Sequence, residues 1–265
     1  MPGSPMFDPL LPPAFFSFAA LVLGLCLGSF YNVCVHRYLV GQSVVSPGSH
    51  CPACGHVLSW WENIPVLSYI LLGAKCRSCK GRIHWRYPAV ELLSGILALL
   101  FAIKFGPTLQ WAVYMAFLGI FLVASFIDLD SFILPDVLTW PAAALALSTP
   151  LYLPVDWAET LLGSLCGAGI FLLLQQAYLR LRGLDALGTG DIKLMLSLGA
   201  LVGLTRLPLM ILLAALSALV VAVAYMRRPD AQGMRTAVPF GPFLCLGAVL
   251  TLLWGDELLN RIIGF

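Results

Sequence analysis

Two acidic residues, Asp128 and Asp191, fall beside long apolar runs of the chain. Ionisable side chains within membrane segments cost free energy and are usually functional. Asp128 is 17 residues, or about 25 Å of helix, from Trp111 at the far end of its run. Asp191 is 15 residues, or about 22 Å, from Arg206. We therefore expect both carboxylates at a similar depth on separate helices, where they can face each other.

A facing pair of carboxylates is the arrangement that an aspartic protease needs. One carboxylate takes a proton from water, while the other, protonated, polarises the scissile carbonyl; the pair shares one proton because two like charges a few ångströms apart cannot both ionise. Gly188 and Gly190 precede Asp191, and glycine allows an extended substrate to approach the backbone closely. We predict Asp128 and Asp191 as the catalytic pair. The alternatives are that Asp191 caps its own helix or is neutralised by Lys193.

Other acids of the chain have simpler interpretations. Asp130 and Asp136 are expected to be exposed loop acids, with Asp136 capping the helix that follows. Glu91 is either a snorkelling residue or a buried partner of Arg86, and the pattern leaves its role open, as it does for Glu62.

Four cysteines form two matched pairs, Cys51 with Cys54 and Cys76 with Cys79, and 21 residues separate the pairs. Four thiolates on two tight turns can surround Zn²⁺ tetrahedrally, and this paired spacing is typical of zinc sites. The alternatives are two disulfides, which a reducing compartment disfavours, or unrelated thiols. Because a four-cysteine site is closed to substrate, we predict a structural role. The other cysteines (Cys26, Cys34, Cys166, Cys245) are interpreted as packing residues, and His50, His56 and His84 as loop or surface residues.

The composition predicts the elements that position these residues. Hydrophobic residues make up 60% of the 265 positions and charged residues 11%, whereas an ordinary soluble domain has about a quarter charged residues. A helix that crosses a membrane needs roughly 20 apolar residues. We therefore predict an all-α polytopic membrane protein with about eight transmembrane helices. The expected spans are 14–34, 89–105, 111–127, 137–153, 161–179, 194–204, 207–226 and 239–254.

The basic residues predict how these spans are oriented. With eight spans, 12 of the 15 Lys and Arg residues fall in one set of loops, and only Lys104, Arg206 and Arg261 fall in the other. Basic residues are retained on the cytoplasmic side during insertion. Both termini are therefore expected outside, and the loop 36–87 in the cytoplasm. The first span lacks a basic leader and is expected to be retained rather than cleaved as a signal peptide.

The predicted organisation has three parts. Residues 1–35 form the first helix, residues 36–87 the zinc-binding loop between helices 1 and 2, and residues 88–265 a seven-helix domain with the aspartates. The basic residues of the loop flank membrane helices, so the lipid bilayer explains them and we expect no nucleic-acid partner.

Several ordered motifs resemble the type IV prepilin peptidase family of bacterial leader peptidases and N-methyltransferases. They are GSFYNV at 28–33, the first cysteine pair, ENIPVLSY at 62–69, the second cysteine pair, RYPAVEL at 86–92, the pair Ile127 and Asp128, LPD at 134–136, and GTGDIKL at 188–194. Tyr31 stands where the family more often has Leu.

The resemblance implies a substrate and a reaction. Family members remove the leader from type IV prepilins and type II secretion pseudopilins, then methylate the new amino terminus with S-adenosylmethionine. Asp128 and Asp191 match the family's catalytic aspartates, and the four loop cysteines match its zinc ligands; no residues can be named for the methyl donor. The alternatives are a peptidase without methyltransferase activity, a proton-coupled transporter, because paired membrane acids also relay protons, and a zinc-stabilised scaffold without chemistry.

Overall fold

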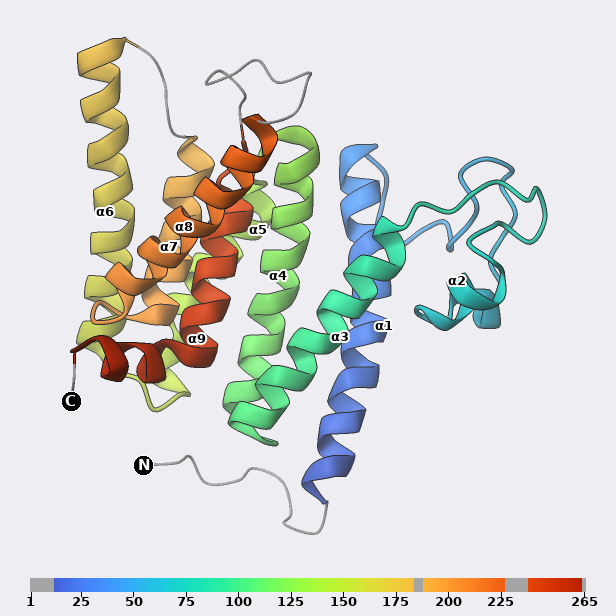
Figure 1. Cartoon of the computed structure of the whole chain (residues 1–265), viewed down its shortest axis with the longest axis horizontal. Helices are drawn as coiled ribbons and strands as arrows, with labels where there is room; N and C mark the ends of the chain where they lie inside the picture. The colour runs from blue at the N-terminus through green and yellow to red at the C-terminus, as the bar shows by residue number, and fades with distance from the viewer. Residues whose placement is uncertain (1–11, 184–187, 227–237, 264–265) are drawn as a thin grey trace. The chain divides into compact units, whose positions relative to one another are not determined.

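The computed structural model describes residues 12–183, 188–226 and 238–263, in which the regular secondary structure is helical apart from two isolated β-bridges (Figure 1). Short 3₁₀ turns cover Trp60–Asn63 and Thr149–Leu151. The α-helices are α1 Pro13–Leu39, α2 Leu67–Leu71, α3 Arg86–Phe105, α4 Leu109–Ser131, α5 Asp136–Leu147, α6 Trp157–Arg182, α7 Thr189–Val202, α8 Leu207–Met226 and α9 Gly241–Ile263. The all-α prediction therefore holds over the described part of the chain.

Six of these helices are long and apolar enough to cross a membrane: α1, α3, α4, α6, α8 and α9. Large apolar side chains remain exposed on them, including Leu173 on α6 and Val220 on α8. An apolar outer surface of this extent fits a hydrocarbon environment, where helices satisfy their own backbone hydrogen bonds. The protein is therefore a multi-pass membrane protein.

The remaining two predicted spans, 137–153 and 194–204, correspond to shorter helices. α5 has 12 residues and α7 has 14, which gives lengths of about 18 Å and 21 Å. A hydrocarbon core is about 30 Å thick. The described helices thus confirm six membrane-spanning candidates, and the count of eight stays a prediction.

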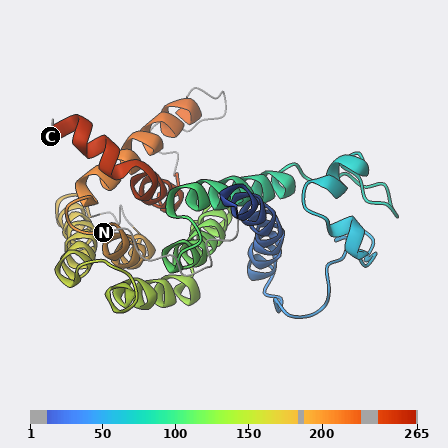
Figure 2. The same ribbon diagram turned by 90° about the horizontal axis from the view of Figure 1, so that it is seen from below.

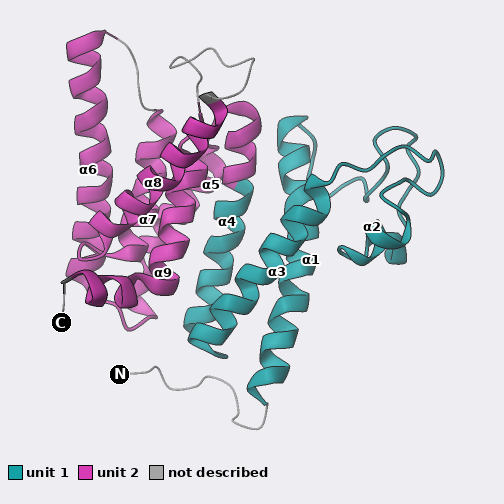
Figure 3. Ribbon diagram, viewed as in Figure 1, with its two compact units in different colours: residues 1–123 teal, residues 124–265 magenta. Residues whose placement is uncertain are grey.

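The chain divides into two compact units, Met1–Val123 and Ala124–Phe265, and α4 contributes residues to both (Figure 3). In the first unit, α1 packs against α3. A side chain at Gly28 would lie 2.7 Å from the Cα of Glu91, and one at Gly95 would lie 2.8 Å from Leu25. Small residues therefore allow the two backbones to approach closely, as is common between membrane helices.

In the second unit, α7 is the central helix and packs against α5, α6 and α9. Its side chains from Leu194 to Val202 are mostly buried. A Cβ atom at Gly163 of α6 would collide with the carbonyl oxygen of Gly199 of α7, and the reverse is also true. α7 is thus enclosed by protein, which places Asp191 at its first turn in the interior of the unit.

The loop between α1 and α3 lies to one side of the α1–α3 pair and contains α2 (Figure 2). Three of the basic residues used to predict orientation, Arg227, Arg228 and Arg235, lie outside the described residues.

Candidate active site and metal site

Asp128 lies in the last turn of α4, and its side chain is buried, with 5% of the residue exposed. Its Oδ2 atom accepts a 3.1 Å hydrogen bond from the backbone N–H of Gly241, the first residue of α9. The free N–H groups at a helix N-terminus favour negative charge. The start of α9 therefore holds one oxygen of Asp128 in a fixed position.

Asp191 lies in the first turn of α7, three residues after the N-cap Gly188, and is 9% exposed. Its carboxylate also bonds to the backbone N–H of Gly188, the N-cap of α7, so the capping alternative stays open. Within the described part of the chain, its Oδ1 atom is buried and has no hydrogen-bond partner. A buried carboxylate oxygen without a partner is costly in a purely structural residue and is common at catalytic sites.

The two aspartates belong to one site. Asp128 and Asp191 interact electrostatically with each other, and both interact with the buried thiol of Cys245 on α9. The side chain of Leu134 fills the space beside them: a Cβ at Gly190 would lie 2.8 Å from the Cβ of Leu134, and one at Gly241 would lie 3.2 Å from its methyl groups. Three helices, α4, α7 and α9, thus bring the predicted pair together.

The structure changes the interpretation of three polar residues near the pair. Lys193 does not neutralise Asp191; its Nζ atom lies 2.6 Å from Oδ1 of Asp136. Asp136 is not the N-cap of α5 either, because Pro135 holds that position and Asp136 is the first helical residue. Asp130 is exposed, but it lies in the last turn of α4 rather than in a loop. Lys193 follows Asp191 by two residues, and such neighbours point to different sides of a helix.

Sequence reasoning missed the contribution of α9. Gly241 lies 113 residues beyond Asp128, so no local spacing could connect them. Cys245 was interpreted as a packing residue; it is buried, but its thiol also lies in the electrostatic environment of both aspartates. The only sequence signal was Gly241 followed by Pro242 at the start of an apolar run, which is typical of a helix N-terminus.

The loop contains two equivalent turns, one around each cysteine pair. The N–H of Cys51 donates to the carbonyl of His56 at 2.8 Å, and the N–H of Cys76 donates to that of Gly81 at 2.8 Å. A single β-bridge closes each turn: His50 pairs with Val57, and Lys75 pairs with Arg82.

The residue four positions after the first cysteine of each pair has a positive φ. This residue is Gly55, with φ 71°, in the first turn and Lys80, with φ 60°, in the second. Lys80 therefore has the left-handed conformation in the second turn, where the first turn has a glycine.

The four cysteines fit a zinc ion. Their Sγ atoms all lie within 4.8 Å of one another; Cys51 and Cys79 are 3.9 Å apart, and Cys54 and Cys76 are 4.0 Å apart. Tetrahedral Zn–S bonds of about 2.3 Å require sulfur atoms about 3.8 Å apart. All four cysteines are free, so the disulfide alternative is not supported.

Backbone donors prepare part of this cluster for metal binding. The Cys79 N–H lowers the pKa of the Cys76 thiol to about 6. Although the Gly81 N–H lowers the pKa of Cys79, the neighbouring thiols and burial raise it to about 11. Cys76 therefore ionises readily, whereas Cys79 keeps its proton, which a bound cation would displace.

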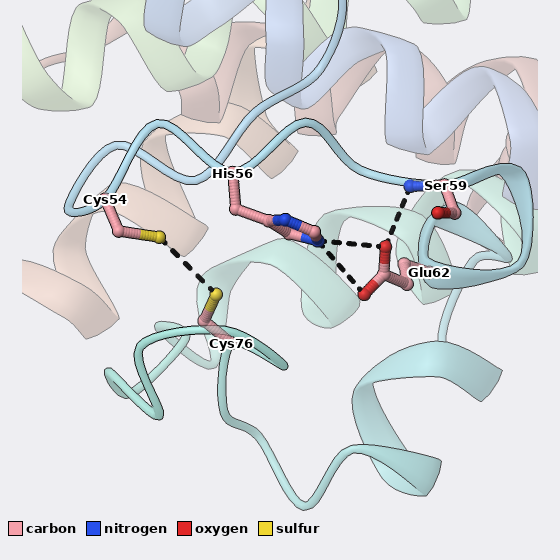
Figure 4. A network of polar contacts seen from close by, with 5 residues as sticks. All are labelled: Cys54, His56, Ser59, Glu62 and Cys76. Carbon is pink, nitrogen blue, oxygen red and sulfur yellow. Dashed lines mark hydrogen bonds and ion pairs between the residues drawn. The ribbon is translucent and has the colours of Figure 1, made fainter.

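Beside the cysteines, His56 pairs with Glu62, as Figure 4 shows. The Nε2 atom of His56 lies 3.2 Å from Oε2 of Glu62, and the N–H of Ser59 donates to the same oxygen at 2.8 Å. The Ser59 N–H lowers the pKa of Glu62. Glu62, only 5% exposed, therefore closes the 3₁₀ turn that it belongs to.

Glu91, whose role the sequence left open, is buried rather than snorkelling. The bonds that the structure gives its carboxylate go to the N–H of Val66, at 2.7 Å, and to the side chain of Ser29. Val66 has φ 62° and ψ −46°, and Leu67 donates to Pro65 across it at 2.6 Å. This is a γ-turn with positive φ, a rare and strained conformation. Glu91 thus fixes a strained turn of the loop onto α3.

These features define a class: a multi-pass, all-helical membrane protein with two interacting buried aspartates and a four-cysteine metal-ligand cluster. Residues 22–105 match the bacterial peptidase A24 N-terminal domain, and residues 113–223 match the type IV leader peptidase family. The chain belongs to this family.

Several curated relatives are similar over most of their length. A prepilin leader peptidase/N-methyltransferase of Pseudomonas aeruginosa is 35% identical, with 98% of each chain covered. One of Pseudomonas putida is 36% identical over 94% of each chain, and one of Myxococcus xanthus is 38% identical over 89% of this chain and 69% of the relative. No solved structure gives a significant match.

Proposed function

We propose that this protein removes the leader from type IV prepilins or type II secretion pseudopilins with Asp128 and Asp191, and then methylates the new amino terminus. The observation that carries the proposal is the pairing of two buried, interacting aspartates on α4 and α7. The relatives, named prepilin leader peptidase/N-methyltransferase, support both reactions. Nothing in the comparisons supports a transporter.

The geometry supports a division of labour between the carboxylates. Asp128, held by the N–H of Gly241, has a donor that stabilises its ionised form. Oδ1 of Asp191 has no partner in the described part of the chain and is available to carry the shared proton. In the proposed reaction, Asp128 takes a proton from water as the water oxygen attacks the scissile carbonyl, and Asp191 donates its proton to that carbonyl.

The decisive experiment uses the purified full-length chain and a synthetic prepilin with its leader. Mass spectrometry should detect loss of the leader and, with S-adenosylmethionine present, a gain of one methyl mass on the mature product. Cleavage without methylation would leave the peptidase-only alternative. Binding of the prepilin without any cleavage would favour the scaffold without chemistry.

We also propose that α5 and α7 cross the membrane, which makes eight crossings. Asp128 ends α4 and Asp191 begins α7, so the two meet only if an even number of crossings separates them. Since the long helix α6 is one crossing, α5 must be the other. Gly241 begins α9 and bonds to Asp128, so the start of α9 must lie on the same side of the membrane as the start of α7. An even number of crossings therefore separates these two points, and since the long helix α8 is one, α7 must be the other. Burial of α7 within the second unit supports a crossing shorter than the hydrocarbon core.

A count of eight membrane crossings also supports the orientation predicted from the basic residues. If α5 and α7 did not cross, Arg180, Arg182 and Lys193 would move to the side that the basic residues otherwise avoid. Both termini are therefore proposed to be periplasmic in the bacterial inner membrane, with the aspartates at the cytoplasmic face. An epitope inserted after Gly183 should be inaccessible to antibody on intact spheroplasts, while one after Thr205 should be accessible. Equal access to both tags would contradict eight crossings.

The chain is proposed to consist of three parts with different roles. Residues 1–35 anchor the chain, residues 36–87 hold one structural zinc through the four cysteines, and residues 88–265 carry the peptidase. The zinc would stabilise the two turns of the loop and perform no chemistry, because four thiolates fill its coordination sphere.

A further inference from the structure

A cavity of about 420 Å³ lies in the first unit, between the helix pair α1 and α3 and the cysteine loop. This volume is in the usual range for a small-molecule site, about 300 to 1,000 Å³. Its walls come from three parts of the chain: the C-terminal half of α1, the first turns of α3, and the loop. The two aspartates belong to the other unit, and neither of them lines this cavity.

The cavity is lined by buried polar groups from each of these parts. Asn32 comes from α1, Glu91 from α3 and Glu62 from the loop, and each is less than a tenth exposed. Burying a carboxylate costs free energy unless it is bonded or meets a positive charge. Arg77 and Arg82 also line the cavity, but both are exposed to solvent, so the two buried carboxylates point to a ligand that carries positive charge.

The hydrogen bonds that the two carboxylates already make do not give either of them a permanently charged cationic partner. Glu91 accepts from the N–H of Val66 and interacts with Ser29, both neutral groups. Glu62 accepts from Ser59 and meets His56, which is charged only if it is protonated.

The buried guanidinium on the lining, Arg37, is directed elsewhere. Its nitrogen atoms donate to the backbone carbonyl oxygens of Ser43, Pro47 and Gly48. It therefore shapes the loop next to the cavity, where carbonyl oxygens satisfy its charge.

The cavity also offers groups that suit the uncharged parts of a nucleoside. Tyr69 and Tyr87 line it, and aromatic rings provide stacking surfaces. The amide of Asn32 donates to the carbonyl of Tyr87 at 3.0 Å, which orients its oxygen as an acceptor.

We propose that this cavity binds the methyl donor, a sulfonium nucleoside, with Glu91 and Glu62 facing its cationic groups. The inference rests on the proposed methyltransferase activity and deepens it. When bound, the donor supplies an electrophilic methyl group on a sulfonium sulfur. Glu91 would orient the ligand directly and also hold the Val66 turn. This turn lies in the chain between the lining residues Asn63 and Ser68.

The test is a binding measurement on the full-length protein in detergent, with two probes that differ in one charge. Sinefungin carries an ammonium group at the sulfonium position, whereas S-adenosylhomocysteine is neutral there. Glu91→Gln and Glu62→Gln should each weaken sinefungin binding about tenfold or more, while S-adenosylhomocysteine binding changes much less. The amide keeps the shape and an acceptor oxygen for the N–H of Val66 or Ser59.

The matched control is Asp256→Asn, which removes one exposed carboxylate of the second unit, where it pairs with Arg206. It should leave the affinity of both probes unchanged. Unchanged sinefungin binding in both glutamine variants would overturn the proposal, as would equal losses for the two probes.

A second measurement does not depend on variants. Ultraviolet crosslinking of labelled S-adenosylmethionine, followed by peptide mapping, should label peptides within residues 29–91. Labelling confined to residues 124–265 would overturn the proposal. Leader cleavage by the same preparation separates this inference from the proposed function: a protein that cuts and methylates but fails these binding tests disproves only the location of the site.

Discussion

The backbone N–H of Gly241, at the start of α9, donates a 3.1 Å hydrogen bond to Oδ2 of Asp128, at the end of α4. A side chain at position 241 would place its Cβ only 2.7 Å from that oxygen. Glycine is therefore required here by a close approach of backbone to carboxylate rather than by a positive φ. The proposed peptidase site thus depends on three helix ends, and α9 contributes a backbone group to it rather than a side chain.

Substitution of either aspartate should remove leader cleavage. Asp128→Asn and Asp191→Asn are each expected to lower kcat/KM at least about a thousandfold, because the amide keeps the shape and loses the ionisable proton. The double variant should be no slower than the worse single one, since the pair acts as one unit. Cleavage rates on a synthetic prepilin measure this effect.

Asp136→Asn is the matched control for the aspartate variants. Asp136 forms an exposed ion pair with Lys193, and such pairs contribute at most about 1 kcal/mol to stability. A loss at Asp136 as large as that at Asp128 would mean that the catalytic pair is wrongly chosen.

Gly241→Ala should damage catalysis more than stability. The added methyl group displaces Asp128, and a shift of about 1 Å at a catalytic group can cost roughly a hundredfold in rate. Thermal unfolding followed in parallel should change by only a few degrees. Gly169→Ala is the control, because a side chain at Gly169 of α6 meets nothing within 4 Å. If Gly241→Ala cleaves at the normal rate, the Gly241–Asp128 contact has no catalytic importance.

Gly199→Ala should destabilise the second unit. The new methyl group would collide with the backbone of Gly163, which cannot yield as a flexible side chain can, so we expect a loss of about 1 to 3 kcal/mol. The midpoint of thermal unfolding in detergent should fall accordingly. Gly169→Ala should leave it unchanged or raise it slightly, because alanine is the better helix former. An unchanged midpoint for Gly199→Ala would argue against close packing of α6 on α7.

Metal analysis of the purified protein should return one zinc per chain. Cys51→Ser should lower the zinc content well below one, because three thiolates bind less tightly than four, and should make the loop sensitive to protease. Leader cleavage should persist, while sinefungin binding should weaken, since the loop forms one wall of the cavity. Cys166→Ser in α6 should keep full zinc content. A zinc content unaffected by Cys51→Ser would exclude the four-cysteine site.

Local sequence patterns were sufficient to predict the helices and both sets of candidate residues. The length of an apolar run depends only on neighbouring residues, so the six long helices followed from composition. The two cysteine pairs were recognisable because both ligands of each turn lie three residues apart. The two aspartates could be paired by counting residues along a helix of known rise.

Only the tertiary structure decided which distant groups meet these residues. The bond from Gly241 to Asp128, the filling of the site by Leu134 and the pairing of Lys193 with Asp136 depend on how helices pack, and helix packing depends on side chains that are far apart in the sequence. Glu91 shows the same limit, because its partner Val66 lies 25 residues away in a strained turn. The sequence by itself thus determined which groups could carry the chemistry, whereas the packing of α4, α7 and α9, and of α1, α3 and the loop, determined what surrounds them.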